Sequence, residues 1–347
     1  MSDIHDVAKL ARVSIATVSN AMNSPEKLSP KTLERVLVAA AKLDYRPNRM
    51  AKSLASSKTH MIGIVVSDIY NPGYTRAIHA MSLYFEDHGY STMLINTDMC
   101  YEKEIEAVNR LIEYKVDGVI INGTAAITRQ VHVKKLAERG IPVVLTNRES
   151  NDADVVMPNF QVAVKTMLTM LKKLGHREMG IIVPPIYDAE GFPTSRYARL
   201  DITLSTLRDM EFSIDPHNIS VVHEASFNGG LRMIQSWIDS GRKIPSALFV
   251  MRDDVALGVI KGLQRNGYRV PEDVSVCGFS NYNYCQYSTP TLSSISSRED
   301  VQGKLAAQLI LERIENPDMQ KKAVEYDCEF VARESIGPAR KENVTNK

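Results

Sequence analysis

The first 47 residues space their apolar positions by three and four, a pattern that predicts short helices and no strands. The first helix is expected over 5–11, and Ser14 can cap a second over 15–22. Ser29 followed by Pro30 supplies the start of a third helix. The apolar positions assigned to a small core are Val7, Ala8, Ala11, Val18, Leu33, Val36, Leu37 and Ala40. Two short helices joined by a tight turn and braced by a third are the helix-turn-helix plan.

Beyond residue 60 the pattern changes to short apolar runs that alternate with amphipathic helices. The runs with strand character are 61–66, 92–96, 118–121, 142–146, 179–183, 247–251 and 274–279. Two of the helices between them are expected over 161–174 and 254–266, each followed by a glycine. Such alternation predicts parallel, doubly wound sheets. Because residues 61–337 are too many for one sheet, we expect two similar lobes with a ligand cleft at the carboxyl ends of their strands.

These patterns divide the chain into four parts. Residues 1–47 form an all-α helix-turn-helix head, and 48–60 form a polar linker that can fold as one short helix. Residues 61–337 form an α/β core of two doubly wound, parallel-sheet lobes, and 338–347 form a flexible tail. The tail has no leucines at heptad spacing, so we do not expect it to form a coiled coil.

Composition places the chain among ordinary globular proteins, with 44% hydrophobic and 24% charged residues over 347 positions. No apolar run approaches the roughly 18 residues of a membrane span, and the first residues include acids where a signal peptide would be apolar. The four cysteines are scattered without the spacing of a zinc site, so we expect no metal, no cofactor and no disulfide framework. The sequence therefore predicts a cytoplasmic protein without membrane contact.

Charge is unevenly distributed along the chain, although the net charge is only +1. Residues 1–60 contain ten lysines or arginines and five acids, so this segment carries +5 and the remainder −4. A compact basic end on an acidic body indicates a segment that meets phosphate. The head is therefore a candidate nucleic-acid-binding domain.

A series of short motifs occurs in order along nearly the whole chain: Asp6-Val-Ala-Lys-Leu-Ala11, Val13-Ser-Ile-Ala-Thr-Val-Ser19, Tyr45-Arg-Pro-Asn48, Ala51-Lys-Ser-Leu54, Ile62-Gly-Ile-Val-Val66, Asp68-Ile-Tyr-Asn-Pro72, Val116-Asp-Gly-Val-Ile120, Leu174-Gly-His-Arg177, Asp254-Val-Ala-Leu-Gly258, Val270-Pro-Glu-Asp-Val274 and Gly278-Phe279. Together they resemble the lactose-repressor (LacI) family of transcription regulators. The resemblance implies a homodimeric regulator, expected to be a repressor, that binds a palindromic double-stranded DNA operator. It also implies that a small-molecule effector, a sugar or sugar derivative, binds in a core like that of periplasmic sugar-binding proteins and controls DNA binding.

The DNA-contacting residues implied by the resemblance are Ser14, Ile15, Ala16, Thr17, Ser19, Asn20, Asn48, Ala51 and Leu54. In the second helix, Ile15, Ala16 and Asn20 would face the bases, and the hydroxyl groups of their neighbours would reach phosphates. In the linker, Leu54 would wedge into the minor groove. Two alternatives stay open. Ile15 and Ala16 can be ordinary helix residues, and Met50 and Leu54 can simply pack the linker of a dimer.

Two positions in the head depart from the family pattern. Asn20 stands where arginine is usual. Because asparagine matches adenine as arginine matches guanine, we expect A·T at the operator position that relatives read as G·C. Arg12 stands where the turn usually has glycine, so it must avoid positive φ or accept strain there. Arg12 can also add a phosphate contact, and the sequence does not decide between these possibilities.

The effector-binding residues implied by the same pattern are Tyr74, Asn147, Ser195, Arg199, Arg252, Asp253 and Ser280. Arg199 begins a helix after a loop that contains glycine and proline. Its guanidinium group can hold vicinal hydroxyls or a carboxylate with a planar fork. The alternative for Arg199 is a salt bridge between the lobes.

Departures from the family pattern make the predicted cleft more positive. Ser280 replaces a usual aspartate, Arg252 replaces a usually uncharged residue, and Arg148 is expected nearby. We therefore expect an anionic effector such as a sugar phosphate or a sugar acid. The alternative is that Arg252 pairs with Asp253 or Asp254 and does not touch the ligand.

Other classes of function fit the sequence less well. An enzyme is disfavoured because GxSxG, a Walker loop, GxGxxG and HExxH are all absent. A periplasmic binding protein would need an export signal and has no use for the basic head. A further alternative keeps DNA binding but replaces the small effector with a protein co-regulator docked on the N-terminal lobes. The sequence does not reveal whether the effector releases DNA or promotes binding.

Overall fold

The computed structural model describes residues 2–46, 58–123, 129–187, 191 and 194–340, and at Asn23 and Ser195 it describes only the backbone. It divides into two compact units, Met1–His60 and Met61–Lys347, and each is described by itself. The linker residues Asn48, Ala51 and Leu54, for which DNA contacts are predicted, lie outside the described residues.

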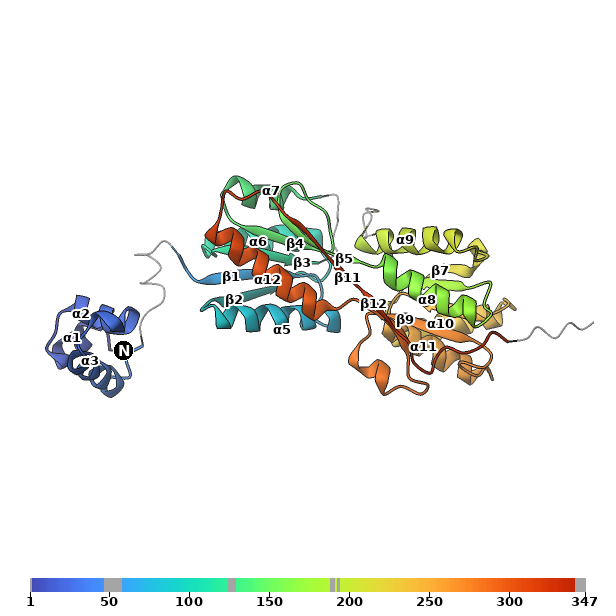
Figure 1. Ribbon diagram of the computed structural model, residues 1–347, viewed down its shortest axis with the longest axis horizontal. Helices are drawn as coiled ribbons and strands as arrows, with labels where there is room; N and C mark the ends of the chain where they lie inside the picture. Colours follow the sequence, from blue (N-terminus) through green and yellow to red (C-terminus); the bar gives the residue numbers. More distant parts are fainter. Residues whose placement is uncertain (1, 47–57, 124–128, 188–190, 192–193, 341–347) are drawn as a thin grey trace, which may run out of the picture. The chain divides into compact units, whose positions relative to one another are not determined.

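The described residues of the smaller unit form three α-helices and a 3-10 turn (Figure 1): α1 (Ile4–Ala11), α2 (Ile15–Asn23), η1 (Pro25–Lys27) and α3 (Pro30–Lys42). Each α-helix begins at a residue whose side chain accepts a backbone N–H of the first turn, namely Asp3, Ser14 and Ser29. Three short capped helices in this order confirm the predicted helix-turn-helix head.

The core of the head is a cluster of small apolar side chains in which Val7, Val18 and Val36 are completely buried. The prediction that Leu37 joins this core is wrong, because Leu37 is 47% exposed. The inward stripe of α3 instead includes Val36 and Ala39, which share one face of the helix at a spacing of three residues. The head thus has a narrower apolar stripe than the sequence pattern predicts.

The turn between α1 and α2 contains a residue in the left-handed region. Arg12 ends α1 with φ 51° and ψ 51°, and its N–H donates to the carbonyl groups of Ala8 and Lys9. This conformation costs a residue with a side chain about 1–2 kcal/mol. Of the possibilities raised for Arg12, the structure shows that the residue adopts positive φ and accepts the backbone strain.

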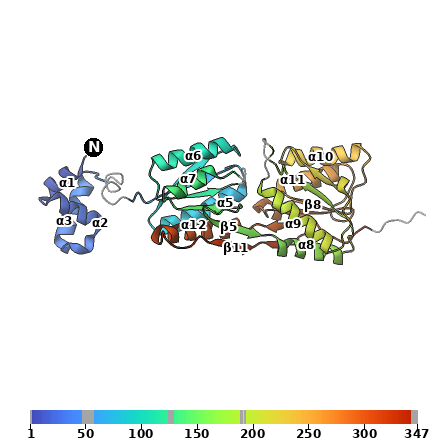
Figure 2. The same cartoon turned by 90° about the horizontal axis from the view of Figure 1, so that it is seen from above.

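The larger unit contains two six-stranded sheets, one in each lobe (Figures 1 and 2). The N-terminal sheet has the order β11-β5-β4-β3-β1-β2 and is parallel throughout. Its strands are β1 (Met61–Val66), β2 (Ser91–Asn96), β3 (Gly118–Asn122), β4 (Val143–Thr146), β5 (Asp154–Asn159) and β11 (Ala323–Asp327). Its helices are α5 (Pro72–Asp87), α6 (Tyr101–Glu113), α7 (Val131–Glu138) and α12 (Glu299–Glu315).

Successive residues of a strand in this sheet pack against opposite helix layers. Ile62 and Ile64 of β1 belong to the apolar cluster that includes α5 and α12. Val65 belongs to the cluster that includes α6 and α7. Because both faces of the sheet are covered, the strands appear in the sequence as unbroken apolar runs rather than as alternating ones.

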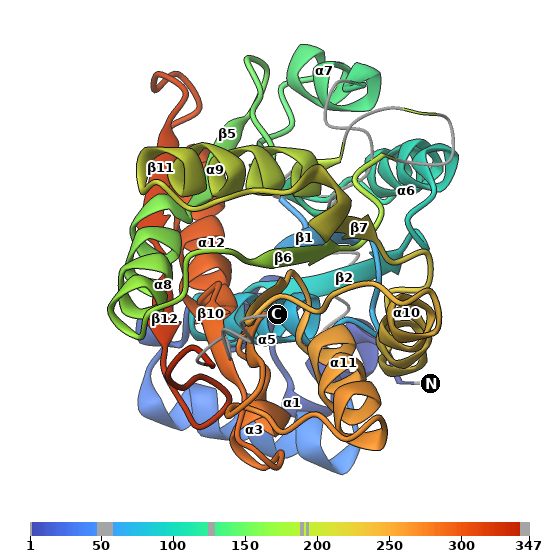
Figure 3. The same cartoon turned by 90° about the vertical axis from the view of Figure 1, so that its right-hand side faces the viewer.

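The C-terminal sheet has the order β12-β10-β9-β8-β6-β7, with β12 antiparallel to β10. Its strands are β6 (Gly180–Val183), β7 (Ile219–Val221), β8 (Ala247–Val250), β9 (Ser275–Phe279), β10 (Ser293–Ser296) and β12 (Glu329–Val331). The helical segments of this lobe are α8 (Gln161–Lys173), α9 (Ser195–Asp209), η2 (Pro216–Asn218), α10 (Phe227–Asp239), α11 (Asp253–Arg265) and η3 (Asn283–Gln286). Figure 3 shows α8 and α9 on one face of the sheet and α10 and α11 on the other. Within the described ranges, no helix is both long and apolar enough to cross a bilayer.

The chain passes between the two lobes three times, from β5 to α8, from β10 to α12 and from β11 to β12 (Figure 1). The first and third crossings lie side by side, because the Cys328 N–H donates to the Asn159 carbonyl at 3.0 Å. Each of the seven predicted apolar runs contains a strand or most of one. The strands that lead into the crossings, β5, β10 and β11, were not among those predictions.

A buried ion pair fixes α12 to β5. Arg313 donates from Nε and Nη2 to the two carboxylate oxygens of Asp154, both at 2.8 Å. The Lys322 N–H donates to the same carboxylate at 2.7 Å. The side chains of Arg313 and Asp154 are 10% and 2% exposed. This pair therefore joins the last helix of the N-terminal lobe to the strand at which the chain first leaves that lobe.

Replacing Asp154 with asparagine should destabilise the N-terminal lobe, because the buried Arg313 charge loses the carboxylate with which it pairs. Removal of one partner from a buried pair costs about 3–5 kcal/mol. Urea unfolding followed by circular dichroism should show a lower midpoint for Asp154→Asn. The matched control is Glu138→Gln, which breaks the exposed pair between Lys134 and Glu138 and should leave the midpoint unchanged. Equal midpoints for both variants would contradict the role given to the buried pair.

Candidate functional site

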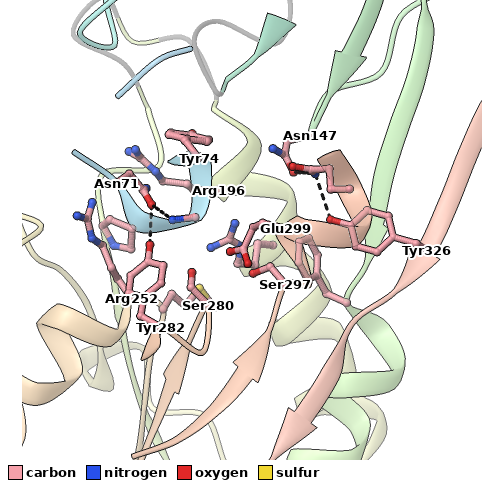
Figure 4. A pocket seen from close by; sticks show the side chains of 16 residues that line it. Asn71, Tyr74, Asn147, Arg196, Arg252, Ser280, Tyr282, Ser297, Glu299 and Tyr326 are labelled. Carbon is pink, nitrogen blue, oxygen red and sulfur yellow. Dashed lines mark hydrogen bonds between the residues drawn. The ribbon is translucent and has the colours of Figure 1, made fainter. Parts of the chain in front are cut away.

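A cavity of about 660 Å³ lies between the two lobes, at the carboxyl ends of their parallel strands. Its lining residues are Asn71, Gly73, Tyr74, Asn147, Phe160, Pro184, Arg196, Arg199, Met251, Arg252, Ser280, Tyr282, Ser297, Glu299, Gln302 and Tyr326. Figure 4 shows that these side chains come from both lobes and surround one space. This is the predicted position of a ligand cleft.

The wall formed by the N-terminal lobe is polar and uncharged over much of its area. Asn71 precedes α5, and its Oδ1 accepts from the Gly73 N–H at 2.9 Å. Gln302 of α12 donates from Nε2 to Asn147 Oδ1 at 2.9 Å and to the Tyr326 hydroxyl at 3.1 Å. Asn147, directly after β4, adopts a left-handed conformation with φ 63°, which asparagine tolerates well. These groups form a row of amides and hydroxyls suited to binding other hydroxyl groups.

Two arginines of α9 belong to the opposite wall. The Arg199 guanidinium carbon lies 3.8 Å from the centre of the Phe279 ring and 5.2 Å from that of Phe160. Burial lowers the pKa of Arg199 to about 10, so it stays protonated at neutral pH. Arg196 donates from Nη1 to the Pro185 carbonyl at 2.9 Å, and burial lowers its pKa as well. In the described part of the chain, neither arginine forms an ion pair, so the structure does not support the salt bridge between lobes considered for Arg199.

Arg252 lines the cavity but is engaged with a neighbouring acid. Its Nε donates to both carboxylate oxygens of Asp254, at 2.8 and 3.0 Å. The two side chains are 20% and 25% exposed, so the pair lies at the edge of the cavity rather than in open solvent. This is the pairing with Asp254 that the sequence left open. The charge of Arg252 is therefore largely balanced by the protein itself.

Asp253 lies behind the wall of the cavity and is completely buried. Its carboxylate accepts from the Ser294 hydroxyl at 2.6 Å and from the Tyr282 N–H at 2.8 Å. Burial raises its pKa to about 6. The contacts hold the loop that follows β9, including Ser280, which adopts φ 106°. Asp253 therefore positions the lining loop and does not itself line the cavity.

The two lobes are also joined by direct contacts beside the cavity. The Tyr282 hydroxyl of the C-terminal lobe donates to Asn71 Oδ1 at 2.7 Å, as Figure 4 shows. Arg76 of α5 donates to the Asn281 carbonyl at 3.3 Å. Arg76 Nη1 also lies 3.8 Å from Glu299 Oε2. A molecule that entered the cavity would lie beside these contacts.

Five of the seven residues predicted to bind an effector line the cavity: Tyr74, Asn147, Arg199, Arg252 and Ser280. Asp253 lies behind it, and Ser195 begins α9 but its side chain is not described. The lining residues that the sequence analysis missed include Asn71, Phe160, Arg196, Tyr282, Ser297, Glu299, Gln302 and Tyr326. Asn71 could have been predicted, since asparagine before proline is a helix-start signal. The lining residues after β5 and β10 and on α12 or β11 could not have been predicted, because their positions depend on the unpredicted crossings.

The expectation that Arg148 lies near the cleft is wrong. Arg148 Nη2 donates to Glu104 Oε1 at 2.6 Å, and His132 Nε2 lies 2.7 Å from the same oxygen. All three residues are at least 98% buried within the N-terminal lobe. Arg148 thus balances a buried carboxylate between α6 and α7 and lines neither cavity.

A second, larger cavity adjoins the first and shares Asn71, Tyr74, Arg196 and Arg252 with it. It is also lined by Tyr101 and by residues after β1, β2 and β6. Among the described residues, no three histidine, cysteine or acidic side chains are grouped as metal ligands.

In the head, the outer surface of α2 carries the residues predicted to face DNA bases. Ile15 is 42% exposed, and Ala16 and Asn20 are exposed as well, whereas Val18 is buried. The Ser14 hydroxyl accepts from the Thr17 N–H at 3.1 Å and so starts the helix. The exposed side of α2 is short and uncharged, and its N-terminal end is able to enter a DNA groove.

Two family models match separate stretches of the chain. The model of bacterial regulatory proteins of the lacI family matches residues 3–48, and that of periplasmic binding protein-like domains matches 168–336. The HTH-type transcriptional repressor PurR of Vibrio campbellii is 30% identical and the match covers 97% of this chain and 99% of the relative. The ribose operon repressor of Haemophilus influenzae is 28% identical, with coverage of 97% and 99%. A lac repressor dimer bound to operator and an anti-inducer has the same fold, with a TM-score of 0.84 at 22% identity, covering 96% of this chain and 98% of that one.

Replacing Asp253 with asparagine should remove a pH dependence of stability. The folded state raises the pKa of Asp253 from 3.8 to about 6, so between these values the folded protein holds a proton that the unfolded chain has released. The contribution of Asp253 therefore favours folding below about pH 4 and is lost as the pH rises to about 6, a change of up to about 3 kcal/mol. Urea unfolding of the wild type and Asp253→Asn from pH 4.5 to 7.5 measures this change in stability.

The expected result is that Asp253→Asn gains stability relative to the wild type as the pH rises through this window. Asparagine can keep both contacts, since its amide can donate to Ser294 while its oxygen accepts from Tyr282. Glu138→Gln, which removes an exposed carboxylate, serves as the control and should follow the wild type. Parallel curves for Asp253→Asn and the wild type would refute the assigned pKa.

Proposed function

The chain belongs to the lacI family of bacterial regulatory proteins, and we propose that it represses transcription by binding an operator through its head, under the control of a small molecule held between the lobes of its core. The observation that carries this proposal is that the chain contains both a helix-turn-helix head and a two-lobed core. A 30% identical repressor matches 97% of this chain. The same relatives are transcriptional regulators, so we assign the cavity a binding role rather than a catalytic one.

For the DNA-binding part, we propose that α2 enters the major groove. Ile15, Ala16 and Asn20 then contact bases, and Ser14, Thr17 and Ser19 contact phosphates. The exposure of Ile15, Ala16 and Asn20 beside a buried Val18 supports this orientation. The basic charge of residues 1–60 supports it as well, because it supplies attraction to the phosphate backbone.

We further propose that the regulator acts as a homodimer on a palindromic operator, with residues 48–60 as the linker between the head and the core. A lac repressor structure of the same fold is a dimer bound to operator, which supports this arrangement. Asn48, Ala51 and Leu54 are the linker residues proposed to contact DNA. Two heads related by a twofold axis require half-sites with matching symmetry.

For the effector-binding part, the proposed contacts are Asn71, Tyr74, Asn147, Arg196, Arg199, Arg252, Ser280, Tyr282, Glu299, Gln302 and Tyr326, with Asp253 as a positioning residue. Ser195 remains a proposed contact at the start of α9. The contacts that join the lobes, Tyr282 to Asn71 and Arg76 to Asn281, lie beside the cavity. A ligand that favours one spacing of the lobes over another shifts the DNA affinity by the difference between its affinities for the two states.

The direct test is operator selection from a random DNA library with the purified full-length protein, followed by binding measurements on the selected sequence. We expect a twofold-symmetric site and an affinity that falls steeply with salt. Small molecules are then screened for those that change this affinity. Failure to enrich any sequence would refute the proposed function.

The operator should carry A·T at the position in each half-site that Asn20 contacts. Asparagine makes two hydrogen bonds with adenine, and such a pair is worth about 1–3 kcal/mol of base discrimination. Asn20→Arg should therefore shift the preference at this position towards G·C by roughly tenfold or more. Competition binding with operators that differ only at this base pair measures the shift.

Thr17→Ala is the matched control, because it removes a proposed phosphate contact from the same helix. It should weaken binding to all operator variants alike and leave the base preference unchanged. A wild-type protein that requires guanine at the Asn20 position would contradict the prediction.

A further inference from the structure

The interlobe cavity holds more positive charge than its own acids balance. Arg252 is paired with Asp254, and Arg76 lies 3.8 Å from Glu299. Arg196 and Arg199 line the same cavity, and neither forms an ion pair with any residue that the structure describes. Asp68 acts on Arg196 and Glu299 on Arg199 without direct contact, so neither arginine has an acid in ion-pair contact among the described residues.

Both unbalanced arginines come from the first turns of α9, three residues apart, so they share one face of the helix. Arg199 is held against the rings of Phe279 and Phe160. Its Nε is buried and has no hydrogen-bond partner in the described part of the chain. Arg196 is held by its bond to the Pro185 carbonyl, which uses one of its five N–H donors. The two guanidinium groups are therefore fixed in place and retain donors for a ligand.

The burial of these groups gives the unbalanced charge a cost. Burial lowers the pKa of both arginines, yet Arg199 at about 10 remains a cation at neutral pH. A buried charge without a partner is unfavourable, and an anion between two guanidinium groups removes that penalty while forming short, charge-assisted hydrogen bonds. A neutral molecule in the same place would leave both charges unbalanced.

The remainder of the cavity suits hydroxyl groups. Asn147, Gln302 and Tyr326 form a hydrogen-bonded row on the opposite wall, and Ser280 and Ser297 add two further hydroxyls. Amides and hydroxyls both donate and accept, as a polyhydroxylated ligand requires. The cavity lining thus combines two guanidinium groups, which suit an anion, with amides and hydroxyls, which suit a polyol.

We propose that the ligand of this cavity is an anionic sugar whose carboxylate or phosphate group is bound by Arg196 and Arg199. The proposal rests on the proposed function, in which the cavity holds the effector. It differs from the expectation drawn from the sequence, which gave this role to Arg199 and Arg252. Arg252 instead forms part of the wall, because Asp254 already balances its charge.

Matched ligands test the charge requirement on the full-length protein. D-glucose, D-gluconate, D-glucuronate and D-glucose 6-phosphate share a carbon skeleton and differ in charge, and inorganic phosphate probes the anion site alone. Calorimetry and thermal shift at constant ionic strength should show at least one anion bound about 30-fold more tightly than glucose, equivalent to about 2 kcal/mol. A preference for gluconate or glucuronate identifies a carboxylate, and one for glucose 6-phosphate identifies a phosphate. Either supports the proposal.

Substitutions test the residues. In Arg196→Gln/Arg199→Gln, stabilisation by every anion of the panel, inorganic phosphate included, should disappear. The melting temperature without ligand should stay equal or rise, since two unbalanced buried charges are gone. A merely structural role for these arginines predicts the opposite, a lower melting temperature. Arg252→Gln should keep the anion-to-glucose preference within threefold, and Arg110→Gln, an exposed arginine of α6, controls for net charge.

Three results would overturn the proposal. The first is glucose binding as well as its anionic counterparts. The second is that the anions stabilise the wild type and Arg196→Gln/Arg199→Gln equally, or stabilise neither protein. The third is loss of the preference in Arg252→Gln alone. Operator binding without ligand is measured for each protein in parallel, so a failure of DNA recognition is distinguished from a failure of anion recognition.

Discussion

The site depends on the three passages of the chain between the lobes, which hold the carboxyl ends of two parallel sheets opposite each other. The segments that follow β1, β4, β8 and β9 are thereby turned towards the same space. Phe160 and Ser297 lie at the passages themselves and line the cavity directly. Any change in the angle between the lobes must bend these segments. A change in the shape of the cavity and a change in the angle between the lobes therefore occur together.

Within this frame the charged groups fall into two kinds. Arg148, Arg252 and Arg313 each have an acid that belongs to the protein, and they fix loops and helices in place. Arg196 and Arg199 form no ion pair with a described residue, although burial lowers the pKa of both. The paired arginines keep the wall of the cavity rigid. The two arginines of α9 leave that wall with a positive charge that can select an anionic ligand.

The sequence allowed the head, the two lobes and most strands to be predicted, because these follow from local periodicity. Leu37 departed from the pattern because α3 turns Val36, Ala39 and Ala40 towards the small core of the head and leaves Leu37 on its exposed side. Five of the seven predicted effector contacts line the cavity: four lie on the segments that follow β1, β4, β8 and β9, and Arg199 lies on α9. Glu299, Gln302 and Tyr326 escaped prediction because they reach the cavity only through late returns of the chain to the first lobe. Arg148 was misplaced because its partner Glu104 is distant in sequence.

Those late returns also set the order in which the protein can be made. Helix α12 and strand β11 complete the N-terminal lobe, yet they follow nearly the whole C-terminal lobe in the chain. A nascent polypeptide leaving the ribosome therefore carries β1 to β5 with the sheet face that α12 will cover still open to solvent. The first sheet is completed only when β11 emerges and the second only when β12 emerges, directly after it in the chain. Both halves of the core therefore mature almost together, and the head, whose segments are all adjacent in sequence, is free to fold long before them.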